Sequence, residues 1–204
     1  MAKKEVKTDL WVYELLKEAG ISLDPQGSSI KELNDALKTA SKSGKGNVGF
    51  PEYCGVVQDF VIVIEDKADV VKHIQRNNDQ LICRENKSIT DFAVNGALHY
   101  GIHLAQNTSY KKVIAIGVSG NEKRHKISPL FINERGEYKE LDDVETFTLF
   151  NDKNIKEYYT KYILKEETDD EKTTVEILKD AKALHEDLRN ANKIPETISG
   201  LSLS

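Results

Sequence analysis

A run of five apolar residues, Phe60-Val61-Ile62-Val63-Ile64, leads directly into Glu65-Asp66-Lys67, and this junction constrains the fold more than any other feature of the sequence. β-Branched and aromatic residues favour strands, and a strand that is apolar on both faces must be covered on both faces. The sequence therefore predicts the central strand of a sheet that lies between two layers, with charged side chains held where the strand leaves the core.

The residues that precede this strand predict the other arm of a hairpin. If Val57 pairs with Phe60 across a two-residue turn, counting outward places Glu52 directly opposite Glu65. Cross-strand neighbours on one face have Cβ atoms roughly 4.5–5.5 Å apart, so the two carboxylates would repel each other unless a cation lay between them. Two features leave this register open. The turn lacks the favoured Asn-Gly or Asp-Gly pair, and a bulge at Gly55 would shift the pairing of the two strands.

Glu65 and Lys67 lie on the same face of the strand, because side chains alternate along it. The carboxylate can ligate a hard cation such as Mg²⁺, and the ammonium can orient an attacking water or stabilise charge that develops at phosphorus. A Glu-x-Lys triplet alone is weak in a chain in which 31% of the residues are charged. Two alternatives stay open: a solvated strand end with a structural ion pair, and a site in which Asp59 replaces Glu52 as the first metal acid.

Apolar residues at helical spacing predict helices around the hairpin, and further apolar runs predict strands beyond it. The predicted helices cover residues 9–19, 30–41, 68–76 and 90–105, and the further strands cover residues 113–118 and 127–132. Charged helical patterns follow at residues 154–164 and 172–192. We therefore expect one domain at residues 1–150 and a helical extension, or a connector to a further domain, at residues 151–204.

The hairpin region carries Gly49-Phe50-Pro51-Glu52-Tyr53 and then Val61-Ile62-Val63-Ile64-Glu65-Asp66-Lys67-Ala68-Asp69. This combination of Pro-Glu with an apolar strand that ends in Glu-x-Lys resembles the PD-(D/E)xK nucleases. It is most similar to the nuclease domain at the start of type I restriction motor subunits and of restriction enzymes fused to adenine methyltransferases. Similar segments follow at Ala93-Val94-Asn95-Gly96-Ala97-Leu98-His99-Tyr100 and Val113-Ile114-Ala115-Ile116-Gly117-Val118-Ser119-Gly120, so the resemblance covers about residues 30–132.

The resemblance implies an α/β restriction endonuclease-like core, with a mixed central sheet flanked by helices and a C-terminal helical extension. It also implies Mg²⁺-dependent hydrolysis of double-stranded DNA, with Mn²⁺ as a substitute. Glu52 and Glu65 would ligate the metal and Lys67 would help position the water. In this family a carboxylate from the helix before the hairpin often joins the site, and Glu32 is the first candidate, with Glu14 and Glu18 behind it.

The implied partners are methyltransferase and sequence-specificity modules in the same polypeptide or complex, because nothing in the chain resembles a base-reading helix. Candidate DNA contacts are Lys42, Lys45 and Tyr100, although a tyrosine at this position is more often a core residue than a DNA contact. Further lysine and arginine residues could form a phosphate-binding rim or be simply solvated. These are Lys123, Arg124 and Lys126.

Three features depart from the family. The first acid is Glu rather than Asp, and Asp66, which should point away from the site, stands where many relatives carry a small or apolar residue. Type I nuclease domains often have a Gln four residues before a Tyr on the following helix. Here Gly96 stands four residues before Tyr100, with Asn95 as a substitute at most. An inactive nuclease fold that binds DNA or a partner subunit is therefore the alternative function.

Composition excludes several other classes of protein. No apolar run approaches the roughly 20 residues of a membrane span, and the N-terminal residues lack the apolar core of a secretory signal. Cys54 and Cys83 have neither CxxC spacing nor a disulfide framework, so we expect reduced thiols in a cytoplasmic protein. The net charge of −5 argues against a simple basic nucleic-acid coat, although a cation site needs carboxylates.

The histidines His73, His99, His103 and His125 are interpreted as packing or surface residues, because no third zinc ligand stands at suitable spacing.

Overall fold

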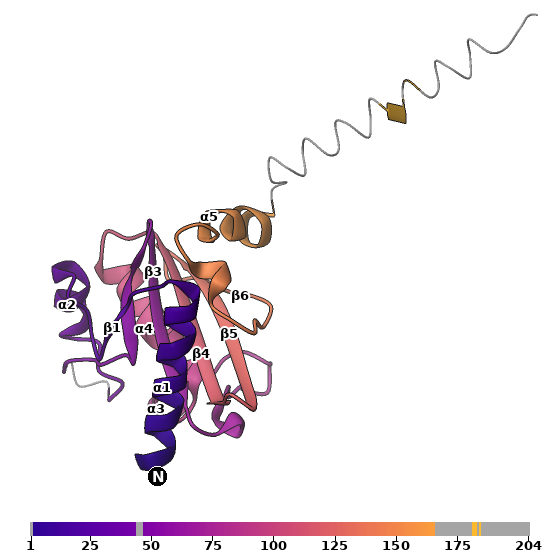
Figure 1. Cartoon of the computed structure of the whole chain (residues 1–204). Coiled ribbons are helices and arrows are strands. Elements are labelled where there is room, and N and C mark those ends of the chain that lie inside the picture. Colours follow the sequence, from indigo (N-terminus) through magenta and orange to yellow (C-terminus); the bar gives the residue numbers. More distant parts are fainter. Residues whose placement is uncertain (1, 44–46, 166–180, 183, 185–204) are drawn as a thin grey trace, which may run out of the picture.

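A computed structural model describes residues 2–43, 47–165, 181, 182 and 184 of the chain (Figure 1). Its centre is a six-stranded sheet in which the strands follow one another in chain order. The strands are β1 (Asp24–Pro25), β2 (Tyr53–Val57), β3 (Phe60–Lys67), β4 (Lys112–Asn121), β5 (Arg124–Asn133) and β6 (Tyr138–Glu140). Only β3 and β4 pair in parallel, and the other four pairs are antiparallel. The predicted mixed sheet is thus confirmed.

Helices cover both faces of this sheet, with α1 in front of it and α4 behind it in Figure 1. The helical elements are α1 (Ala2–Ala19), α2 (Lys31–Leu37), η1 (Val70–Lys72), α3 (Asn86–Asp91), α4 (Ala93–Asn107), η2 (Thr148–Phe150), α5 (Ile155–Tyr158) and η3 (Tyr159–Leu164). Side chains alternate along β3, so Val61 and Val63 pack toward α4, whereas Ile62 and Ile64 pack toward α1. All four are at most 1% exposed, which confirms β3 as a central strand.

The hairpin has the predicted register, with Val57 paired to Phe60 and Tyr53 paired to Ile64. No bulge interrupts the pairing at Gly55. Gln58, in the two-residue turn, has a positive φ of 57°. Apart from Gly, Asn and Asp, residues rarely adopt such an angle. The hairpin therefore forms in spite of an unfavourable turn sequence, because its two arms are buried against the core.

The helices differ from their predicted bounds in ways that matter for the site. α1 begins at Ala2 rather than at residue 9, so Asp9 lies inside the helix and does not cap it. The predicted helix at 68–76 is reduced to the single 3-10 turn η1. The predicted helix at 90–105 is divided at Phe92, whose extended backbone (φ −121°, ψ 136°) ends α3 and starts α4.

The segment after residue 150 belongs to the same packed body. Ile155 and Tyr158 are buried in the cluster that covers the α1 face, and the Tyr159 ring lies 5.3 Å from the ring of Phe60. Packing thus continues past the expected domain boundary to about residue 164. The helix predicted at 172–192 lies almost wholly outside the described residues. Within the described part of the chain, none of the helices has the length and apolarity needed to cross a bilayer.

Candidate metal centre

Glu65 is a fully buried carboxylate near the end of β3, where it pairs with Gly117 of β4. Two glycines let the start of α4 close over it. A Cβ atom at Gly117 would lie 2.6 Å from the backbone nitrogen of Val94, and a Cβ atom at Gly96 would lie 3.2 Å from Glu65 Oε2. Gly96, four residues before Tyr100, thus makes room for the carboxylate.

Two ammonium groups converge on one oxygen of Glu65. Lys42, in the turn that follows α2, forms an ion pair with Oε2, and Lys67 Nζ lies 3.9 Å from the same atom. The exposed fractions of the two lysine side chains are only 17% and 20%. The other oxygen, Oε1, is buried and has no hydrogen-bond partner among the described residues. A buried acceptor without a partner is costly, so this oxygen favours a further donor or cation.

A pocket of about 340 Å³ opens at the same end of the sheet, and Glu65 itself is not among the residues that line it. Its lining residues are Val6, Asp9, Glu52, Asp66 and Lys67. Glu52 stands one residue before β2, and its carboxylate accepts a hydrogen bond from the Gln26 side chain next to β1. Asp9 comes from α1 and accepts a hydrogen bond of 2.6 Å from the Tyr53 hydroxyl. The pocket therefore gathers acids from α1, from the residue before β2 and from β3.

Asp9 is the helix carboxylate that sequence reasoning missed. It is the first residue of the helix predicted at residues 9–19, and it stands three residues before Val12 and seven before Leu16, both buried. That spacing puts Asp9 on the flank of the stripe that faces the sheet, which is a signal the sequence contained.

Asp66 lies on the opposite face of β3 from Glu65, as alternation predicts, but it is not outside the site. It is 5% exposed, lines the pocket with Glu52 and Lys67, and its Oδ2 has no hydrogen-bond partner among the described residues. Burial, reinforced by the charges of Glu52 and Asp9, raises the pKa of Asp66 to about 8. Burial and the charge of Glu65 also raise the pKa of Glu52. The cluster thus holds more negative charge than its surroundings stabilise.

Asp66 should make the metal-free protein less stable as the pH rises. Its pKa is higher in the folded state than in the unfolded chain, so folding favours the protonated form and stability is lost as the pH rises through about 8. We expect the free energy of unfolding to fall by up to about 1.4 kcal/mol per pH unit. Urea titrations between pH 6.5 and 8 measure this slope. Below pH 6.5 the effect of Asp66 is opposed by His73, because burial lowers the pKa of His73 to about 4. Lowering the pH in that range therefore destabilises the fold through His73.

Asp66→Asn should flatten the dependence of the free energy of unfolding on pH. Asp59→Asn serves as the matched control. Asp59 is exposed, and its hydrogen bond with Lys112 lowers the pKa of its carboxyl, so it is ionised throughout this range. An unchanged slope in Asp66→Asn would contradict the placement of this carboxyl in a charge-rich, desolvated pocket.

The structure does not bring Glu32 to the cluster. Its carboxylate accepts hydrogen bonds from the backbone and hydroxyl of Ser109, which precedes β4, whereas Glu65 pairs with Gly117 in the second half of that strand. Glu32 lies away from Glu65 because its carboxylate is held beside the start of β4. Glu14 and Glu18 are exposed on α1 and also lie outside the pocket.

Asp59 does not replace Glu52 as the first acid. It sits in the hairpin turn and pairs with Lys112 at 2.8 Å. Glu65 is six residues further along the chain, or roughly 20 Å away. Tyr100 is 2% exposed, and its hydroxyl accepts a hydrogen bond of 3.0 Å from Phe50, so it is a core residue rather than a DNA contact. Lys45 lies outside the described residues.

Three of the four histidines named above form hydrogen bonds within the fold. His73 is buried between the hydroxyls of Ser119 and Ser128, at 2.8 and 2.7 Å. His99 and His103 each bond a backbone carbonyl of the α2 region, at 2.9 Å in both cases. None of these three contacts Glu65.

The donor set of the cluster fits Mg²⁺. In the part of the chain that the structure describes, no group of three or more His, Cys, Asp or Glu side chains is already gathered at ligating positions. Mg²⁺ does not need such a cage, because it keeps several waters and is bound by one or two carboxylates together with substrate phosphate. Glu65, with its unpartnered Oε1, and Glu52, with its raised pKa, provide two such carboxylates.

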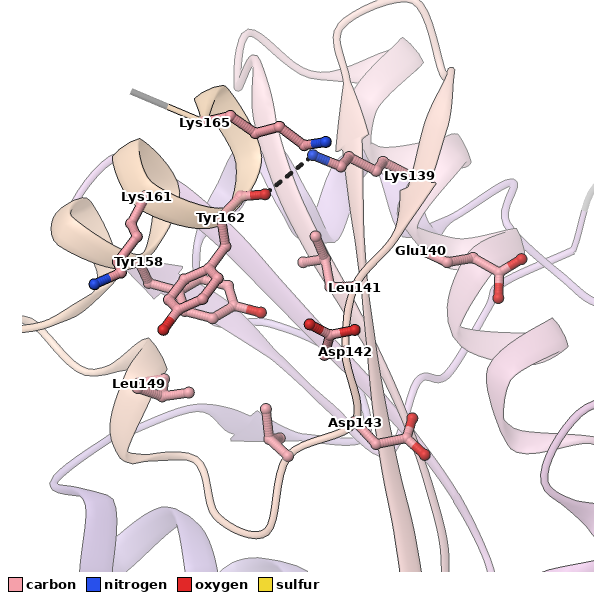
Figure 2. A pocket seen from close by; sticks show the side chains of 11 residues that line it. Lys139, Glu140, Leu141, Asp142, Asp143, Leu149, Tyr158, Lys161, Tyr162 and Lys165 are labelled. Carbon is pink, nitrogen blue, oxygen red and sulfur yellow. Dashed lines mark hydrogen bonds between the residues drawn. The ribbon is translucent and has the colours of Figure 1, made fainter. Parts of the chain in front are cut away.

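A larger pocket, of about 480 Å³, lies elsewhere, between the strand β6 and the C-terminal helices (Figure 2). The Tyr158 and Tyr162 rings stack along it with their centroids 4.9 Å apart, and Lys139 Nζ donates a 3.0 Å hydrogen bond to the Tyr162 carbonyl. It contains none of the residues predicted to form the site, and its acidic and basic side chains are mixed.

Comparison with known proteins gives one relative. A protein of Heyndrickxia coagulans described as "Type II restriction enzyme and methyltransferase RM.BcgI" is 36% identical over 196 residues. The chain is related to a restriction-modification protein. The match covers 95% of this chain but 31% of the relative, so the chain spans about a third of the relative's length. No family model matches the sequence, and no solved structure matches it.

Proposed function

We propose that this chain is the nuclease part of a restriction-modification protein and that it hydrolyses DNA phosphodiester bonds with the help of Mg²⁺. The observation that carries the proposal is Glu65, a fully buried carboxylate at the end of a central strand with a lysine two residues later. The name of the relative supports the restriction part of the proposal, and the length that the chain shares with it is compatible with one functional module of several.

In the proposed site Glu65 and Glu52 hold the cation, which when bound polarises the phosphate and lowers the pKa of a coordinated water. Lys67 lines the open pocket and stands on the same rigid strand as Glu65. Its ammonium orients the attacking water or stabilises the charge that develops at phosphorus. Asp9 is the added helix acid, and the Tyr53 hydroxyl fixes its orientation.

DNA would reach this site along a basic edge of the sheet. Lys67 pairs with Ser119, and Ser119 pairs with Lys126, so the two lysines stand two strands apart, roughly 10 Å. Lys126 is exposed, as are Lys123 and Arg124 in the same β4–β5 hairpin. These side chains can contact backbone phosphates without reading bases. Base recognition and methylation would then belong to other modules of the polypeptide or complex.

The alternative is an inactive module of the same fold that binds DNA or a partner subunit. One observation favours it: Lys42 forms an ion pair with Glu65. The two functions differ in what a divalent cation does, because an inactive module gains no hydrolytic activity from it.

Cleavage of supercoiled plasmid tests the proposal. We expect the purified chain to nick plasmid in Mg²⁺ or Mn²⁺ and to lose this activity in EDTA. Lys67→Met, which keeps the length of the side chain, should reduce the nicking rate about a hundredfold, because it removes one charge that stabilises the transition state. Activity that is unchanged in Lys67→Met would assign the cleavage to a contaminant or to another site. Absence of cleavage under all conditions would favour the inactive module.

A further inference from the structure

We propose that Lys42 is the chain's own counter-cation for Glu65: its ammonium neutralises the carboxylate when no divalent cation is bound and leaves it when one binds. This inference rests on the proposed function, because it concerns the same site. Lys42 then acts as a competitor of the metal and sets the metal concentration at which the site becomes occupied.

The need for an occupant follows from the burial of Glu65. The side chain is 0% exposed, and leaving a buried carboxylate unpaired costs several kcal/mol. Lys67 lies 3.9 Å from Oε2, beyond hydrogen-bond distance, so it compensates the charge only partly. Lys42 makes the direct contact with that oxygen and supplies most of the compensation.

The two lysines differ in how they are attached to the fold. Lys67 is the last residue of β3 and is held by the sheet. Lys42 lies in a turn outside the helices and strands, five residues after the end of α2. Its side chain can therefore leave Glu65 without breaking secondary structure, whereas Lys67 stays in the pocket. The fixed lysine is suited to catalysis, and the lysine in the turn is suited to exchange with a cation.

The charge of Lys42 opposes a divalent cation on the same carboxylate. A Cβ atom at Gly96 would already lie 3.2 Å from Oε2, so α4 closes one side of this oxygen. Lys42 contacts Oε2 directly and Lys67 lies 3.9 Å from it, so the unpartnered Oε1 is the oxygen left for a metal. An ammonium on Oε2 and a divalent cation on Oε1 would repel each other strongly at about 4 Å in a poorly solvated site. Binding of the metal therefore favours a position of Lys42 away from Glu65.

The Tyr100 ring defines the position of Lys42 in the metal-free state. The Lys42 ammonium lies 5.2 Å from the centre of this ring, within the range of a cation–π contact. The hydrogen bond from the Phe50 backbone to the Tyr100 hydroxyl, 3.0 Å, fixes the ring. The contact directs the ammonium toward Glu65 when no metal is bound.

Metal affinity measured by calorimetry tests this competition. We expect Lys42→Met to bind Mn²⁺ about tenfold more tightly than the wild type, because it removes the competing ammonium. The same variant should be less stable than the wild type in the absence of metal, since Glu65 loses its partner. Lys38→Met is the matched control: it removes an equal charge near the end of α2, where Lys38 pairs with exposed Asp35 at 2.6 Å, and should leave the Mn²⁺ affinity unchanged.

The direction of the change separates competition from a structural role. A lysine that only holds the site together would weaken Mn²⁺ binding when replaced, whereas a competitor strengthens it. If the wild type binds Mn²⁺ and Lys42→Met binds it no more tightly, the Lys42 inference is wrong and the proposed cation site stands. If neither protein binds Mn²⁺, the cation site itself is wrong.

A measurement on the wild type decides the matter if Lys42→Met fails to fold. Limited acetylation followed by mass spectrometry reports how accessible each lysine is. We expect the acetylation of Lys42 to increase several-fold when Mg²⁺ is added, while that of Lys38, whose side chain is 62% exposed, stays constant. Acetylation of Lys42 that does not respond to Mg²⁺ in a protein that binds Mg²⁺ would overturn the inference.

Discussion

Glu65→Gln is expected to lower the rate of plasmid nicking by at least about a thousandfold in Mg²⁺, to the level of the EDTA control. The substitution keeps the shape of the side chain and removes the charge that would hold the cation. Because Glu65 is buried between α4 and the sheet, no neighbouring acid on the same face of β3 can replace it. The rate of conversion of supercoiled to open-circular plasmid measures the effect.

The control for this experiment is Glu14→Gln. Glu14 is an exposed acid on α1, outside the pocket, so the variant makes the same change of charge without touching the site. It should cut plasmid at the wild-type rate. A Glu65→Gln protein that is folded and retains a tenth or more of the activity would refute the assignment of Glu65 as a metal ligand.

Gly117→Ala should be the most destabilising small substitution near the site, with a loss of about 3 kcal/mol in the free energy of unfolding. The added Cβ would lie 2.6 Å from both the N and Cα atoms of Val94, and backbone atoms cannot rotate away as a side chain can. The first turn of α4 would have to move off β4, and this turn carries Gly96 against Glu65. Urea unfolding of the metal-free protein measures the loss.

Gly55→Ala provides the comparison for Gly117→Ala. Its nearest non-neighbouring atom is the end of the Leu23 side chain, 3.0 Å away, which can shift at small cost. We expect a loss below about 1.5 kcal/mol at this position. Equal losses in the two variants would contradict the close packing of α4 on the sheet at Gly117.

The hairpin could be predicted from the sequence because its information is local. A period of two, a short turn and an apolar run that ends in charge together place Tyr53 opposite Ile64, and the structure has this pairing. The short edge strands could not be predicted in the same way. β1 and β6 have two and three residues, and their pairing depends on longer strands that they meet only in the folded chain.

The acids around Glu65 were only partly predictable because their positions depend on packing between elements distant in the sequence. Glu32 and Asp9 both stand on helices before the hairpin, but only α1 crosses the sheet near Glu52. Asp66 was expected outside the site from strand alternation alone. Asp9 and Glu52 lie close to Asp66 on the face of the sheet that α1 covers. Both faces of β3 therefore contribute to one charged cluster.

The most direct test of the central claim is a calorimetric titration of Mn²⁺ into the wild type and into Glu65→Gln, because it does not depend on other modules of a longer protein. The account predicts saturable binding to the wild type and its loss in the variant, with both proteins folded. Equal binding to both would show that Glu65 does not hold a cation, and the proposed nuclease site would then be wrong.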